Sequence, residues 1–102
     1  MKYIFVHGLG QDFSSWNQTV SHMNLENKIV CPDLYSFLKR DEASYSSLYK
    51  HFSQYCDEIS EPISLCGLSL GGVLALNYAI DNPSKVKSLI LIATQYQMPK
   101  VL

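Results

Sequence analysis

The sequence predicts an α/β domain of three layers, α/β/α, in which a parallel sheet of about four strands lies between helices. Strand-like apolar segments alternate with segments of helical spacing, in the order strand, helix, strand, helix, strand, helix, strand. The last strand segment includes residues 89–93, which are apolar at every position, as expected of a strand buried on both faces. The length of 102 residues is typical of one domain. We therefore expect residues 1–102 to form a single domain.

The first half of the chain contains two of these strands. Residues 2–7 are mainly aromatic and β-branched and lead into two closely spaced glycines, which predicts a buried strand ending in a turn. Apolar residues then recur at three- and four-residue spacing through residues 13–23, which predicts a helix. Residues 28–31 predict a second short strand, which ends at a proline because proline cannot donate to a sheet ladder. Residues 33–42 show no period and are expected to be a loop.

The second half is more regular. Residues 45–59 carry a continuous apolar stripe at helical spacing, and residues 63–66 predict the third strand. Residues 73–80 are apolar nearly all round, which predicts a buried helix. Asn82-Pro83 ends this helix, because proline disfavours the helical conformation of the residue before it. Residues 86–93 then predict the fourth strand.

Composition restricts the classes of protein to which the chain can belong. An apolar fraction of 47% with 17% charged residues is typical of a globular protein and excludes intrinsic disorder. The formal net charge of −1 argues against a nucleic-acid partner or an anionic membrane, either of which requires a basic face. No apolar run approaches the ~20 residues of a membrane span, and the run before His7 is too short for a signal peptide. We expect a cytoplasmic protein without a nucleic-acid or membrane partner.

The three cysteines favour the same compartment. Cys31, Cys56 and Cys66 are odd in number and lack the spacing of metal ligands. We therefore expect reduced, free thiols and no metal site.

The most informative segment is Gly67-Leu68-Ser69-Leu70-Gly71, which matches G-x-S-x-G between a predicted strand and a predicted helix. A serine hydroxyl attacks a carbonyl only if it stands clear of the backbone, which a tight strand-to-helix turn allows. The N-terminus of the following helix offers N–H groups and positive potential to a developing oxyanion. The alternative is a glycine-rich turn that carries an unreactive serine.

Several segments together resemble the N-terminal half of an α/β-hydrolase fold protein of the small esterase and lipase-like type. His7-Gly8-Leu9-Gly10, followed by Trp16, resembles the oxyanion loop and first helix of that family. Residues 32–34 resemble the segment after its next strand, and residues 67–72 resemble its nucleophile elbow. Residues 82–92 resemble its helix exit and following strand, so the match covers nearly the whole chain in order.

The resemblance implies a strand order and a set of site residues. It places the first strand centrally, the second on one side, and the third and then the fourth on the other. It implies that Ser69 is the nucleophile and that the backbone N–H groups of Leu9 and Leu70 form the oxyanion hole. It implies that His7 and Gly8 support the oxyanion loop, and it implies no cofactor.

Other residues of the chain could also carry chemistry. In the family, the residue that matches His7 is structural, so we do not expect it to be the general base. His22 and His51 are expected on the surface, and Asp33 is expected to hold its loop. Gly8-Leu9-Gly10 lacks the third glycine of a dinucleotide fingerprint, and no phosphate-loop motif is present.

The sequence departs from the family pattern in its last 21 positions. Residues 82–102 contain no Asp, Glu or His, whereas the resemblance places the triad acid and base after the fourth strand. We therefore expect an incomplete α/β-hydrolase domain. Its function is interpreted as a serine hydrolase that acts on a small-molecule ester or related acyl substrate through a Ser69 acyl-enzyme. The alternative is a non-catalytic binding or interaction module. The exposed edge of the fourth strand predicts a homo-oligomer.

Overall fold

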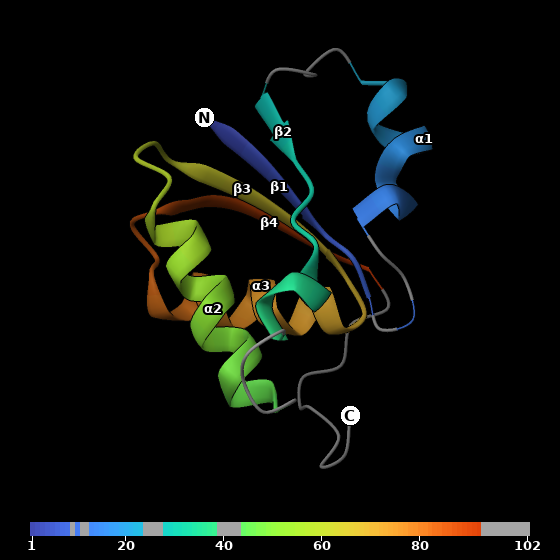
Figure 1. The fold of residues 1–102 in the computed structure, drawn as a ribbon. Coiled ribbons are helices and arrows are strands. Elements are labelled where there is room, and N and C mark those ends of the chain that lie inside the picture. Colours follow the sequence, from blue (N-terminus) through green and yellow to red (C-terminus); the bar gives the residue numbers. More distant parts are fainter. Residues whose placement is uncertain (9, 11–12, 24–27, 39–43, 93–102) are drawn as a thin grey trace.

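The computed structural model describes residues 1–8, 10, 13–23, 28–38 and 44–92. Its centre is a four-stranded parallel sheet with the order β2-β1-β3-β4, as Figure 1 shows. The strands are β1 (Lys2–Val6), β2 (Ile29–Val30), β3 (Ile63–Leu68) and β4 (Val86–Ile92). The predicted fold class and the strand order implied by the resemblance are confirmed.

The helices differ in regularity. They are η1 (Phe13–Trp16), α1 (Asn17–Ser21), η3 (Leu34–Leu38), α2 (Tyr45–Asp57) and α3 (Leu70–Asp81), where η denotes a 3₁₀ helix. The helix expected over residues 13–23 is therefore a 3₁₀ turn followed by a short α-helix, and Trp16, at the start of α1, makes no capping hydrogen bond with its side chain. By contrast, Ser44 caps α2 by accepting the Ser47 N–H at 3.1 Å, which gives this helix a defined beginning.

The loop expected over residues 33–42 contains the 3₁₀ helix η3, so that expectation is wrong for its first part; residues 39–43 lie outside the described residues. The physical reason is local hydrogen bonding around Asp33. Its carboxylate accepts the Tyr35 N–H at 3.1 Å, and its carbonyl accepts the Ser36 N–H at 3.1 Å. A turn of this kind depends on one side chain and leaves no apolar periodicity.

Helices cover both faces of the sheet. On one face, α2, α3 and η3 cover the sheet, as Figure 1 shows. Phe52, Leu74 and Ile4 are completely buried in this core. On the other face, Trp16 packs edge-on against Phe5, with ring centroids 5.1 Å apart. The alternation of side chains along β1 supplies both cores, so the central strand is buried on both sides.

The face of β4 on the α1 side is exposed in the described part of the chain. Ile90 pairs in register with Cys66, and Ile92 pairs with Leu68, so all four lie on the face that α1 partly covers. Ile90 and Ile92 are 58% and 43% exposed. The expectation that the fourth strand is buried on both faces is therefore wrong for the described residues, because η1 and α1 pack on this side over β1, β2 and β3 rather than over β4. Ala93, the last residue expected in this strand, lies outside the described residues.

Cys31, Cys56 and Cys66 are free thiols. Burial raises the pKa of Cys56 to about 12 and also raises the pKa of Cys66 above its ordinary value. Among the helices described, none is both long enough and apolar enough to cross a membrane.

Candidate active site

Ser69 lies between the end of β3 and the start of α3, at the carboxyl edge of the sheet. Its φ of 54° and ψ of −115° form a conformation that L-residues rarely adopt, and it is the one non-glycine residue with positive φ in the described part of the chain. Such a conformation costs on the order of 1–3 kcal/mol and persists only where the surroundings impose it. The side chain is exposed and makes no capping hydrogen bond to α3.

Backbone hydrogen bonds on both sides of Ser69 impose this conformation. The Ser69 N–H donates to the Ile92 carbonyl at 2.9 Å, which ties the turn to the end of β4. The Ser69 carbonyl accepts the N–H of Gly72 at 2.9 Å and that of Val73 at 3.2 Å, which starts α3. Because both peptide groups are held, the hydroxyl is directed by the backbone rather than by a side-chain hydrogen bond.

The two glycines of the motif allow the close packing of this turn. A Cβ placed at Gly67 would lie 2.5 Å from the Gly71 carbonyl oxygen. A Cβ placed at Gly71 would lie 2.5 Å from the His7 carbonyl oxygen. Real Cβ atoms do not approach so closely, so both positions require glycine. The consequence is that the end of β1 lies directly against the start of α3.

This arrangement places Ser69 at the switch point of the sheet. β1 and β3 are neighbours, while the chain continues outward to β2 on one side and to β4 on the other. Ligands of open parallel sheets bind at the carboxyl ends of the strands where the order reverses in this way. Both the motif and the topology therefore select the same edge.

Leu70 is the first residue of α3, and its side chain is buried. The first N–H groups of a helix have no partner within the helix and carry the positive end of its dipole. The Ser69 N–H is already donated to Ile92, so it is not available to a ligand, whereas the helix itself leaves the Leu70 N–H without a partner. Leu9, the other residue expected in the oxyanion hole, lies outside the described residues.

His7 is 1% exposed, and both of its ring nitrogens make hydrogen bonds. Nε2 accepts the Leu34 N–H at 3.0 Å, which requires this nitrogen to be unprotonated. Nδ1 then carries the proton and donates to the Gly8 carbonyl at 2.9 Å. The ring is therefore a neutral connector between the end of β1 and η3, with neither nitrogen available to accept a proton from Ser69.

The other candidate residues lie elsewhere. His22 is exposed at the end of α1, where its Nδ1 lies 2.7 Å from the Gln18 carbonyl, and His51 is in α2. The hydrogen bonds of His7 and His22 go to residues other than Ser69. Asp33 Oδ1 lies 3.8 Å from His7 Nε2 and accepts the Tyr35 N–H, in agreement with the expected role in its loop.

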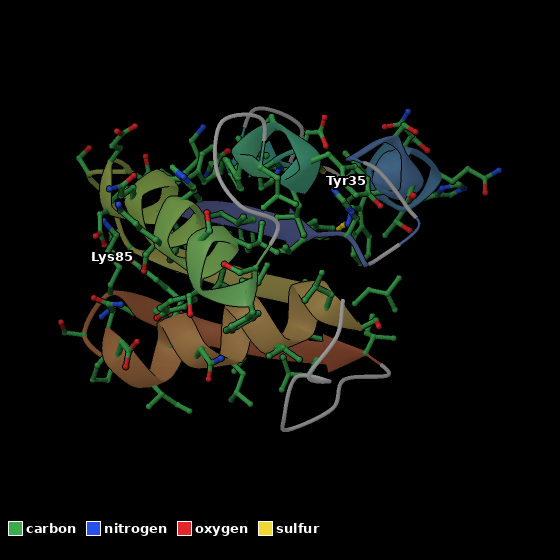
Figure 2. The ribbon with its side chains drawn as sticks, turned by 60° about the horizontal axis from the view of Figure 1, so that its bottom comes forward. Tyr35 and Lys85 are labelled. Atoms are coloured by element: carbon green, nitrogen blue, oxygen red, sulfur yellow. The ribbon has the colours of Figure 1, made fainter. Side chains whose placement is uncertain are left out.

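One residue at this edge was not singled out from the sequence. Tyr35 accepts the Gly10 N–H on its phenolic oxygen at 2.9 Å, and its ring centroid lies 5.4 Å from that of His7. Tyr35 is in the segment without periodicity, and its partner is 25 positions away, so no local pattern could reveal the contact. Figure 2 shows Tyr35 at the end of the sheet opposite to Lys85.

Comparison with known proteins identifies the family. A family model described as the alpha/beta hydrolase family matches residues 3–101. The chain belongs to this family. It is 28% identical over 94 residues to the pimeloyl-[acyl-carrier protein] methyl ester esterase of Legionella pneumophila (strain Corby). The match covers 92% of this chain and 38% of that protein.

Solved structures of this family superpose on the chain. The crystal structure of a membrane phospholipase A matches with a TM-score of 0.80 and 28% identity, covering 99% of this chain and 34% of that one. The alpha/beta hydrolase domain-containing protein 10 from mouse matches with a TM-score of 0.75 and 27% identity, covering 91% of this chain and 40% of that one. This α/β hydrolase therefore spans well under half the length of these relatives.

Proposed function

We propose that this α/β hydrolase acts as a serine hydrolase on an ester or related acyl substrate, with Ser69 as the nucleophile. The observation that carries the proposal is the backbone of Ser69, an exposed serine held at a φ of 54° between β3 and α3. A turn without a function has no need to hold a serine in a strained conformation, and strain of this kind gathers at active sites. The relatives named as esterase and phospholipase A support ester chemistry of the same class.

In this mechanism the Ser69 oxygen attacks the substrate carbonyl as a general base takes the hydroxyl proton. The N–H groups of Leu70 and Leu9 donate to the oxyanion that forms, and His7 and Gly8 hold the loop that carries Leu9. The tetrahedral intermediate then expels the alcohol, which receives the proton from the base, and leaves an acyl group on Ser69. Water, deprotonated by the same base, hydrolyses this ester and releases the carboxylic acid.

The general base and its acid partner are proposed to come from outside these 102 residues. His7 is fully engaged by Leu34 and Gly8, and residues 82–102 offer no Asp, Glu or His. Each relative is more than twice as long as the part that matches this chain. The 102 residues alone are therefore expected to hydrolyse esters weakly, because oxyanion stabilisation and binding without a triad leave only about 10³–10⁴-fold acceleration over water.

The test is hydrolysis of a short-chain nitrophenyl ester by the 102-residue chain, by its Ser69→Ala variant, and by a version extended past Leu102 to the length of the relatives. We expect weak turnover by the 102 residues and strong, Ser69-dependent turnover by the extended version. Strong Ser69-dependent turnover by the 102 residues would show that one of their histidines is the base. An extended, folded version that hydrolyses the ester equally well with Ala at position 69 would refute the nucleophile.

A second candidate is a non-catalytic interaction module, which the exposed apolar face of β4 at Ile90 and Ile92 favours. The same experiment discriminates the two functions. A folded, extended version without Ser69-dependent turnover would favour the interaction module.

A further inference from the structure

Two neighbouring residues of η3 hold the loop that follows β1. The Leu34 N–H donates to His7 Nε2 at 3.0 Å, at the start of the loop. The phenolic oxygen of Tyr35 accepts the Gly10 N–H at 2.9 Å, three positions further along. The segment from His7 to Gly10 is therefore attached to η3 at both of its ends, by residues that are 27 and 25 positions away in the sequence.

The position of Tyr35 is itself well defined. Asp33 accepts the Tyr35 N–H on its carboxylate and the Ser36 N–H on its carbonyl, which fixes the first turn of η3. The Tyr35 ring lies beside the His7 ring, with an angle of 39° between the two planes. Tyr35 is 42% exposed, and these backbone and ring contacts orient its phenol toward the Gly10 N–H.

The contact with Tyr35 also occupies the Gly10 N–H, which follows the end of β1. Gly10 has a φ of +81°, a conformation that favours glycine, and its N–H donates to Tyr35. It cannot donate to an oxyanion at the same time. The hydrogen bond to Tyr35 therefore removes Gly10 from the donor set and holds its backbone in one orientation.

We propose that Tyr35 is a positioning residue of the Ser69 site, which acts through Gly10 to set the orientation of the oxyanion loop. This inference rests on the proposed function. A donor group must be aligned to within a fraction of an ångström, and small displacements by residues away from the chemistry can cost up to about 10²-fold in rate. Removal of the phenolic oxygen should therefore slow the reaction of Ser69 without weakening the binding of the reagent.

The experiment compares Tyr35→Phe with Tyr49→Phe in the full chain. Tyr35→Phe removes only the oxygen and keeps the ring beside His7. Tyr49→Phe is the matched control, since it removes a phenolic hydroxyl that donates to Asp81 at the far end of α3 from Ser69. The first measurement is the amide hydrogen exchange of Gly10 by NMR. Loss of one hydrogen bond should speed it by about 10-fold in Tyr35→Phe, and the control should leave it unchanged.

The second measurement is the covalent modification of Ser69 by a fluorophosphonate ester, in which the serine oxygen bonds to phosphorus and fluoride leaves. In Tyr35→Phe we expect the maximal rate to fall about 5- to 20-fold, with an unchanged half-saturating concentration.

Unchanged exchange at Gly10 would refute the contact. Faster exchange with an unchanged maximal rate would reduce Tyr35 to a structural role, as would an equal loss of rate in Tyr49→Phe. If Ser69 in the unsubstituted chain reacts with the fluorophosphonate no faster than an exposed helical serine does, the proposed function fails. The amide exchange of Gly10 would still decide whether the contact with Tyr35 exists.

Discussion

Replacement of Ser69 by glycine should stabilise the protein relative to replacement by alanine. Both substitutions remove the hydroxyl, but only glycine removes the Cβ that makes a φ of 54° with a ψ of −115° unfavourable. The comparison therefore isolates the backbone strain from any hydrogen bond of the side chain.

The magnitude follows from two opposing effects. Relief of the strained conformation contributes about 2 kcal/mol, within the usual range for such residues. The greater freedom of glycine in the unfolded chain costs about 1 kcal/mol. Ser69→Gly should therefore exceed Ser69→Ala by about 1 kcal/mol in free energy of unfolding, which raises Tm by roughly 4–8 °C in a domain of this size.

Ser46 provides the matched control. It is exposed in α2, where the backbone is helical and glycine is unfavourable. At this position glycine should be about 0.5–1 kcal/mol less stable than alanine. The assay is urea and thermal unfolding of the four variants, followed by circular dichroism. The reasoning would be refuted if alanine at position 69 were as stable as glycine, or if both positions showed the same order.

Two further predictions concern β4 and Cys56. The exposed apolar edge of β4 should drive self-association, so the unsubstituted chain should sediment as a dimer or larger species. Ile90→Lys should shift the chain toward the monomer. An unsubstituted chain that stays monomeric at all concentrations would contradict the prediction. Burial raises the pKa of the Cys56 thiol from near 9 to about 12, so the unfolded state loses its proton first as the pH rises. The free energy of unfolding should therefore fall as the pH rises above about 9, by about 1 kcal/mol at pH 10. In urea unfolding, Cys56→Ala should lose less free energy of unfolding between pH 8 and pH 10 than the unsubstituted chain. An equal loss in both proteins would refute the assignment.

The regular elements could be predicted because their patterns are local. The apolar stripe from residue 45 onward predicts α2, and the strand that leads into Gly67 and Ser69 predicts the turn at which β3 ends. The strand order could not be read from periodicity and came from the resemblance to the family. The helix α2 and the turn at the end of β3 are thus features for which local sequence pattern and tertiary packing agree.

The remaining features depend on contacts between distant residues. The turn at η3 depends on the side chain of Asp33, and the contact of Tyr35 depends on how that turn meets Gly10. The exposure of Ile90 depends on where α1 packs, which the composition of β4 does not encode. No periodic pattern carries information of this kind.

The most direct test of the central claim is to map the site at which a fluorophosphonate reacts with the 102-residue chain. Peptide mass spectrometry would compare the rate at Ser69 with the rate at Ser46, an exposed serine on α2 that serves as an internal reference. Oxyanion donors at the start of α3 should make Ser69 the faster site even without a general base, and Ser69→Ala should leave only the slow background. Equal rates at Ser69 and Ser46, or a faster reaction at any other serine, would contradict the assignment of Ser69 as the nucleophile.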